Sequence, residues 1–172
     1  MYFEHLPLIN YTNIENGDPK LVTNLLKRIA IREPIKNNAT LFSKYTIKNG
    51  ETPENLAFEF YDDANLHWVI LLTNNIYDRY HQWPMSTRQF QAYINDKYSN
   101  PNDTHHYEID QTSGDTTIKI NIGQDNTDHP TATIVTNVEY EEAEQDKKRR
   151  IRLLDRGYVS VFVSSYKQLI KE

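Results

Sequence analysis

The chain has 172 residues, no cysteine and a formal net charge of −5 at pH 7; 38% of its residues are hydrophobic and 12% are aromatic. So aromatic a composition excludes a disordered chain, and the absence of cysteine excludes a disulfide framework or a thiolate metal site. A mean hydropathy of −0.75 predicts no membrane span, and the negative charge argues against a dedicated nucleic-acid binder.

Residues 1–16 are expected to form an extended arm, in which Tyr2, Phe3 and Leu6 are among the apolar residues. The arm has no basic n-region and no long apolar h-region, so we expect no secretory signal. Its apolar side chains either pack back on their own domain or insert into a neighbouring protein.

A helix is predicted after the arm, because Asp18 can serve as its N-cap and Pro19 as its first residue. Apolar residues follow at helical spacing, and Pro34 is expected to end the element. The residues on the predicted apolar face are Leu21, Val22, Leu25, Leu26 and Ile29.

The stretch YTIKNGETPENLAFEFYDDANLHWVILLTNN predicts a strand, a tight turn and two short helices. Residues 41–47 form the strand, with Tyr45 and Ile47 on one face, and Gly50 supplies a positive φ in the turn. Thr52 is placed to cap the first helix, with Pro53 at its first position. The expected apolar positions of the two helices are Leu56, Ala57, Phe60, Leu66, Trp68, Val69, Ile70 and Thr73.

Four aromatic or amphipathic residues follow within seven positions, on a segment that we expect to be a loop: Tyr77, Tyr80, His81 and Trp83. Tyrosine and tryptophan combine a large apolar area with a polar group, so this cluster is a candidate interface. The alternative is a packing role, which we favour for Trp83. A helix is then predicted from Ser86, which forms a capping box with Gln89.

The remainder predicts a hairpin, a charged helix, a strand and a final helix. Strands are expected at 107–110 and 116–122, with a further strand at 131–138, and Gly114 is the expected turn. Residues 139–150 have acidic residues first and basic residues last, as the helix dipole favours, with i,i+4 pairs Glu144–Lys148 and Asp146–Arg150. A strand at 151–154 precedes a helix capped by Asp155.

The charged and histidine-rich positions do not indicate an enzyme. The KKRR run, which includes Arg149 and Arg150, could contact phosphate or acidic neighbours, but paired, solvated side chains explain it better. His105, His106 and His129 lack partners at metal-ligand spacing. The acids Glu141, Glu142 and Glu144 share one helix, and no nucleophile elbow, P-loop or dinucleotide motif occurs. We therefore expect no catalytic residue, cofactor or metal.

The stretch from Tyr45 to Asn75 resembles a LysM module. The positions that match are Tyr45, Ile47, Gly50, Glu51, Thr52, Leu56, Ala57 and either Asn74 or Asn75, and Trp68 is expected in the same core. Carbohydrate-binding LysM modules usually end in a glycine-centred closing strand, and YDRYHQWPMS stands in that place. LHWVILLTNNIYDRYHQWPMS, the aromatic N-terminus and the C-terminal helix–strand–helix resemble the LysM-containing baseplate wedge proteins of T4-like contractile-tailed bacteriophages.

This resemblance implies an α+β fold with three parts: an N-terminal arm and helix (1–40), a LysM-like βαα domain (41–85) and a C-terminal helix–hairpin–helix region (86–172). It implies a structural virion protein of the tail baseplate, assembled in the host cytoplasm. The expected partners are other wedge and hub-proximal tail proteins, without nucleic acid or membrane. The chain is expected to be monomeric when isolated and present in several copies in a ring. The alternative function is a peptidoglycan-binding LysM module.

Overall fold

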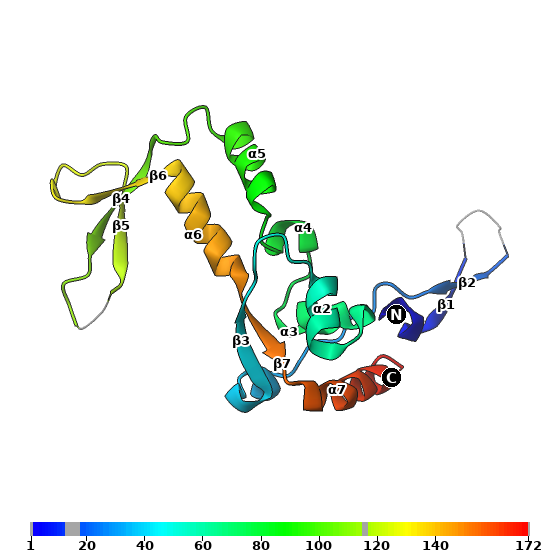
Figure 1. Ribbon diagram of the computed structural model, residues 1–172. Coiled ribbons are helices and arrows are strands. Elements are labelled where there is room, and N and C mark those ends of the chain that lie inside the picture. Colours follow the sequence, from blue (N-terminus) through cyan, green and yellow to red (C-terminus); the bar gives the residue numbers. More distant parts are fainter. Residues whose placement is uncertain (1, 13–17, 115–116, 172) are drawn as a thin grey trace. The chain divides into compact units, whose positions relative to one another are not determined.

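The computed structural model describes residues 2–12, 18–114 and 117–171 (Figure 1). These residues form two compact units. The first unit contains the described residues up to Trp83 together with those from Arg150 onward, and the second runs from Pro84 to Arg149. Helices and strands occur in both units, in agreement with the predicted α+β class.

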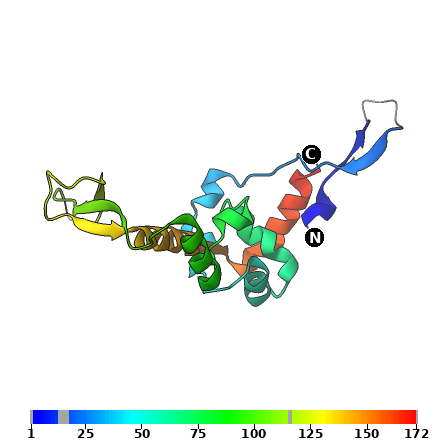
Figure 2. The ribbon, with the colours of Figure 1, turned by 90° about the horizontal axis from the view of Figure 1, so that it is seen from above.

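The first unit is built around two helices and an antiparallel strand pair. Strand β3 (Phe42–Thr46) leads into α2 (Pro53–Tyr61) and α3 (His67–Thr73), as predicted. The partner of β3 is β7 (Arg150–Leu154), whose Ile151 lies opposite Tyr45. Helix α7 (Arg156–Leu169) follows β7 and lies alongside α2 in both views (Figures 1 and 2).

Local sequence signals explain how this unit begins. Gly50 has a φ of 76°, which a glycine adopts without strain. The Thr52 side chain accepts a hydrogen bond from the backbone N–H of Asn55, and Pro53 opens α2. Helix α2 ends at Asp62, whose φ is 58°, and Asp63 caps a short 3₁₀ helix, Ala64–Leu66.

The core of the first unit is apolar and joins segments that are far apart in sequence. The indole of Trp68 on α3 packs against Tyr166 of α7, with ring centroids 4.5 Å apart. The other buried apolar residues of this cluster are Leu6, Ile47, Leu56, Ala57, Tyr61, Val69, Ile70, Trp83, Ile151, Leu153, Leu154, Val159 and Ile170. Helix α7 is therefore part of the same core as the predicted LysM-like segment.

The helix predicted from Asp18 to Pro34 is wrong. Strand β2 (Lys20–Thr23) pairs with β1 (Leu8–Tyr11) instead, and residues 24–32 have no helix. All eight side chains of the two strands are exposed, so Leu21 and Val22 of the predicted apolar face stay uncovered, whereas Ile29 packs against the core without forming a helix. Pro34 does not end an element but lies in the first turn of α1 (Glu33–Lys36), where its missing N–H costs nothing.

The second unit consists of a three-stranded sheet and two helices. Helix α5 (Thr87–Lys97) starts at the predicted capping box of Ser86 and Gln89. Strand β4 (Thr104–Asp110) lies between β5 (Lys119–Gly123) and β6 (Thr133–Thr136), which gives the order β5-β4-β6. The strands predicted at 107–110, 116–122 and 131–138 are thus confirmed with shifted bounds, and helix α6 (Asn137–Arg149) follows.

The observed units divide the chain differently from the expected regions 41–85 and 86–172. The segment after Arg150 does not stay with α5 and the sheet but returns to complete the first unit through β7 and α7. Among the described residues, no helix is long and apolar enough to cross a membrane.

Candidate protein-interaction surfaces

The aromatic segment after α3 separates into exposed and buried side chains. Tyr77 and Tyr80 are 64% and 88% exposed, and His81 points into solvent as well. The segment is not all loop, because a one-turn helix, α4 (Arg79–Gln82), starts where Asp78 accepts hydrogen bonds from the N–H groups of Tyr80 and His81. The hydrogen bond from His81 is the main cause that lowers the pKa of Asp78.

Trp83 lies in the core, as we favoured from the sequence. Its Nε1 donates a hydrogen bond to the carbonyl oxygen of Glu51, at 2.9 Å, in the turn that precedes α2. Arg79 forms an ion pair with Glu54 at 2.6 Å in the first turn of that helix. The segment from α4 to Trp83 is thus attached to the β3–α2 turn at two points.

The N-terminal residues differ in where they lie. Leu6 is 7% exposed and belongs to the core of its own unit, so its side chain is not free to meet a partner. The side chains of Tyr2 and Phe3, the other two interface candidates, lie outside the described residues. Strands β1 and β2 follow with their side chains exposed.

The basic run at the end of α6 is partly neutralised within the helix. Lys147 pairs with Glu144 at 2.5 Å and Arg149 pairs with Asp146 at 3.4 Å. These are i,i+3 pairs, so the predicted i,i+4 pairs are wrong. Helix α6 ends at Arg149, and Arg150 is an exposed residue at the start of β7, which removes it from helical register.

The residues that carried the LysM resemblance lie around the β3–α2 turn and the end of α3. The Tyr45 hydroxyl donates to the Glu51 carboxylate at 2.9 Å, and burial together with this carboxylate raises the pKa of Tyr45 to about 12. Ile47, Leu56, Ala57 and Trp68 are buried. These contacts support the local fold of the turn.

Asn74 has a role that the sequence did not reveal. Its side-chain nitrogen donates to the carbonyl oxygen of Arg152 at 2.7 Å, and its side-chain oxygen accepts from the Arg152 N–H at 2.8 Å. The amide thus bonds one residue of β7 as a neighbouring strand would. Asn75 has a φ of 56° and turns the chain away after α3.

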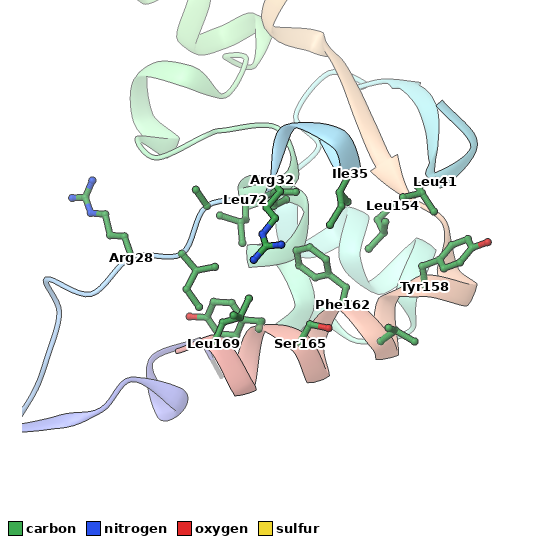
Figure 3. A pocket seen from close by; sticks show the side chains of 15 residues that line it. Arg28, Arg32, Ile35, Leu41, Leu72, Leu154, Tyr158, Phe162, Ser165 and Leu169 are labelled. Carbon is green, nitrogen blue, oxygen red and sulfur yellow. The ribbon is translucent and has the colours of Figure 1, made fainter. Parts of the chain in front are cut away.

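A groove in the first unit is the second feature that sequence reasoning missed. It has a volume of about 630 Å³ and lies between residues 28–35 and one face of α7 (Figure 3). Its lining is mostly apolar and includes Ile35, Tyr158, Val161, Phe162 and Leu169. The 3.6-residue period of α7 predicts an apolar face. It does not show that part of the apolar surface of this helix lies outside the core of the first unit.

The clustered polar side chains of the second unit contact one another and hold its elements together. Lys97 of α5 lies 2.5 Å from the carboxylate of Glu141 on α6, and the Tyr98 hydroxyl donates to the same carboxylate at 2.9 Å. His105 stacks on Tyr140 with centroids 3.9 Å apart. In the described part of the chain, no three His, Cys, Asp or Glu side chains are grouped to hold a metal ion.

Comparison with known proteins complements this geometry. The family model for base plate wedge protein 53 matches residues 6–129, which is more than two thirds of the chain. The chain belongs to the base plate wedge protein 53 family. This membership confirms the predicted location in the tail baseplate of a virion and the broader prediction of a structural baseplate role.

One relative in this family comes from Enterobacteria phage T4. It is described as baseplate wedge protein gp53, and it is 42% identical to this chain over 57 residues. The match covers 33% of this chain and 29% of the relative. The family match ends at residue 129, so the similarity includes β3, α2, α3 and Trp83 but not α6, β7 or α7.

Proposed function

We propose that this chain is a non-enzymatic subunit of a phage tail baseplate wedge that clamps neighbouring wedge proteins together around the tube and hub during tail assembly. The family match over residues 6–129 carries this proposal. The partners are other wedge and hub-proximal tail proteins, rather than nucleic acid or membrane. The chain is a monomer when isolated, and several copies assemble into a ring in the host cytoplasm.

The surfaces of the chain suit this role. The pair Tyr77 and Tyr80 offers exposed aromatic area, and the groove beside α7 offers an apolar concave surface. Of the two arginines proposed as contacts, Arg150 is exposed and Arg149 is paired with Asp146. Several modest interfaces on one chain strengthen each other, because binding at one raises the effective concentration at the next.

The core of the first unit supports a reused LysM-like fold. The order β3–α2–α3 matches the resemblance, and β7 supplies an antiparallel partner for β3 where the sequence lacks a closing strand directly after α3. We propose that the second unit is an insertion before this closing strand. The fold then serves as a protein-binding block.

Peptidoglycan binding is the second candidate function, favoured by the LysM-like arrangement and the positive φ of Gly50. Two contacts count against it: Trp83 bonds to Glu51 and Arg79 pairs with Glu54, so the segment after α3 is fixed beside the turn that would border a glycan groove. Co-sedimentation with insoluble peptidoglycan tests this candidate, and Gly50→Val should abolish any specific binding.

Quantitative mass spectrometry of purified contractile-tailed particles that carry this chain tests the main proposal. We expect a fixed ratio to the other wedge proteins across preparations. Absence of the chain from particles would overturn the structural role and favour the glycan-binding function.

A further inference from the structure

Helix α7 is apolar on two sides, and the described part of its own chain buries only one of them. Val159, Tyr166 and Ile170, the residue after the helix, are buried against the core. On another side, Tyr158, Val161 and Leu169 are 49%, 62% and 45% exposed. A helix that is apolar around most of its circumference is normally buried all round, so the second side is suited to a partner.

This second side is one wall of the groove described above. Figure 3 shows Phe162, Ser165 and Leu169 along α7 facing residues of the segment that leads into α1. The groove runs along α7 from Tyr158 to Leu169, a helical length of roughly 18 Å at 1.5 Å per residue. That length accommodates about three turns of a second helix.

One wall of the groove, formed by the segment that leads into α1, is positively charged. The charged residues that line the groove are Arg28 and Arg32, and no acidic residue lines it, although the whole chain has a net charge of −5. Helix α7 contributes no charged side chain to this lining, and its Arg156 pairs with Asp62. Within the described ranges, Arg28 and Arg32 take part in no ion pair. Arg32 extends over the groove toward Phe162, whereas Arg28 points outward (Figure 3).

We propose that this groove binds an amphipathic helix of another baseplate protein, whose apolar side packs on α7 and whose Asp or Glu side chains pair with Arg32. This inference rests on the proposed function and adds the chemistry of one partner. Helix-in-groove binding uses apolar anchors at helical spacing, and acidic residues beside these anchors would complement the positive charge of Arg32. Pairing would give Arg32 the carboxylate that its own unit does not provide.

Site-specific photo-cross-linking in assembled particles tests this proposal. A photoreactive phenylalanine analogue replaces Ser165, which lines the groove, or its exposed neighbour Ser164, whose hydroxyl donates to the Ser160 carbonyl at 2.9 Å. The two positions differ by about 100° around α7. We expect the analogue at 165, and not at 164, to link to a peptide of another particle protein that has apolar residues at helical spacing and at least one acidic residue.

Charge variants of Arg32 provide the second measurement. Arg32→Glu should lower the cross-link yield at position 165 about tenfold, and Arg32→Lys should largely retain it. Equal yields at 164 and 165, insensitivity to Arg32→Glu, or a cross-linked peptide from a second copy of this chain would overturn the proposal. If the chain is present in particles at a fixed ratio and position 165 forms no cross-link, this inference fails and the proposed function stands. Absence from particles contradicts the function itself.

Discussion

Neighbouring aromatic residues of the segment after α3 have opposite roles, which depend on what their side chains contact. Trp83 is 7% exposed and bonds to the Glu51 carbonyl, whereas Tyr80 is 88% exposed. The sequence places both residues in one short aromatic segment, although it favours a packing role for Trp83. The contact with the β3–α2 turn confirms that role and leaves Tyr80 as an interface candidate.

Substitution should separate these two roles. Trp83→Ala should lower the free energy of unfolding of the first unit by about 3–5 kcal/mol, because it removes a large buried side chain. Tyr80→Ala should change that free energy by less than about 0.5 kcal/mol, yet reduce incorporation of the chain into particles. Urea unfolding followed by the fluorescence of Trp68 measures the first effect, and particle composition measures the second. Normal incorporation of Tyr80→Ala would contradict an interface at this residue.

Tyr61 predicts a loss of stability at high pH. Burial is the main cause that raises its pKa to about 12, from an ordinary value of 10. Between these values the unfolded chain loses the phenolic proton while the folded chain keeps it, so stability falls as pH rises. The loss should reach roughly 2 kcal/mol by pH 12.

The comparison of Tyr61→Phe with the parent chain isolates this effect. The variant should lose the hydrogen bond from the Tyr61 hydroxyl to the Leu154 carbonyl, and its urea midpoint should fall less steeply between pH 9 and 11.5. Tyr80→Phe is the matched control, because that exposed side chain should leave the slope unchanged. Identical slopes for Tyr61→Phe and the parent chain would refute the prediction.

At the scale of elements, prediction from sequence succeeded where local chemistry decides the structure. Thr52, Gly50 and the Ser86–Gln89 capping box each act within a few residues, and the structure confirms all three. The predicted helix from Asp18 does not form, because an amphipathic helix needs a surface that covers its apolar face. Residues 20–23 pair with β1 as a strand instead.

The candidate sites depended more on long-range contacts, so the sequence predicted them less well. The side chain of Asn74 forms hydrogen bonds with the backbone of Arg152, 78 positions away, and no local sequence pattern predicts this contact. The groove beside α7 similarly requires residues 28–35 to lie against a helix that starts at Arg156. Exposed tyrosines could be proposed from composition, whereas a concave surface made of distant segments could not.

The pairing of α5 with α6 should depend on one buried carboxylate. Glu141 has a side chain only 6% exposed; burial alone would raise its pKa, but hydrogen bonds from Lys97 and Tyr98 lower it overall. Lys97→Met should therefore destabilise the second unit by about 1–3 kcal/mol, since it removes the cation from a buried acid. Lys147→Met, at the exposed pair with Glu144, should cost less than about 0.5 kcal/mol.

Amide hydrogen exchange of α5 and α6 measures this difference, because both tryptophans lie in the first unit and do not report on the second. Faster exchange is expected for Lys97→Met alone. Equal exchange in the two variants would show that the ion pair contributes nothing to the α5–α6 contact.

At the scale of the whole molecule, the chain leaves the first unit after Trp83 and returns to it at Arg150. The strand that pairs with β3 and the helix that covers Trp68 both come from the C-terminal segment. The core of segment 41–85, which the sequence predicts to be a continuous LysM-like domain, is therefore completed by residues from Arg150 onward.

Two deletions test this dependence. Replacing residues 84–149 by a flexible Gly/Ser linker should leave a cooperative unfolding transition, because β7 and α7 can still complete the core. Ending the chain at Arg149 should abolish that transition, since it exposes the apolar faces of α2 and α3 and leaves Tyr61 without the Leu154 carbonyl. Tryptophan fluorescence follows both, because Trp68 and Trp83 are retained. A cooperative transition in the truncated chain would show that residues 41–85 fold without the closing strand, and the first unit would then not be one cooperative structure.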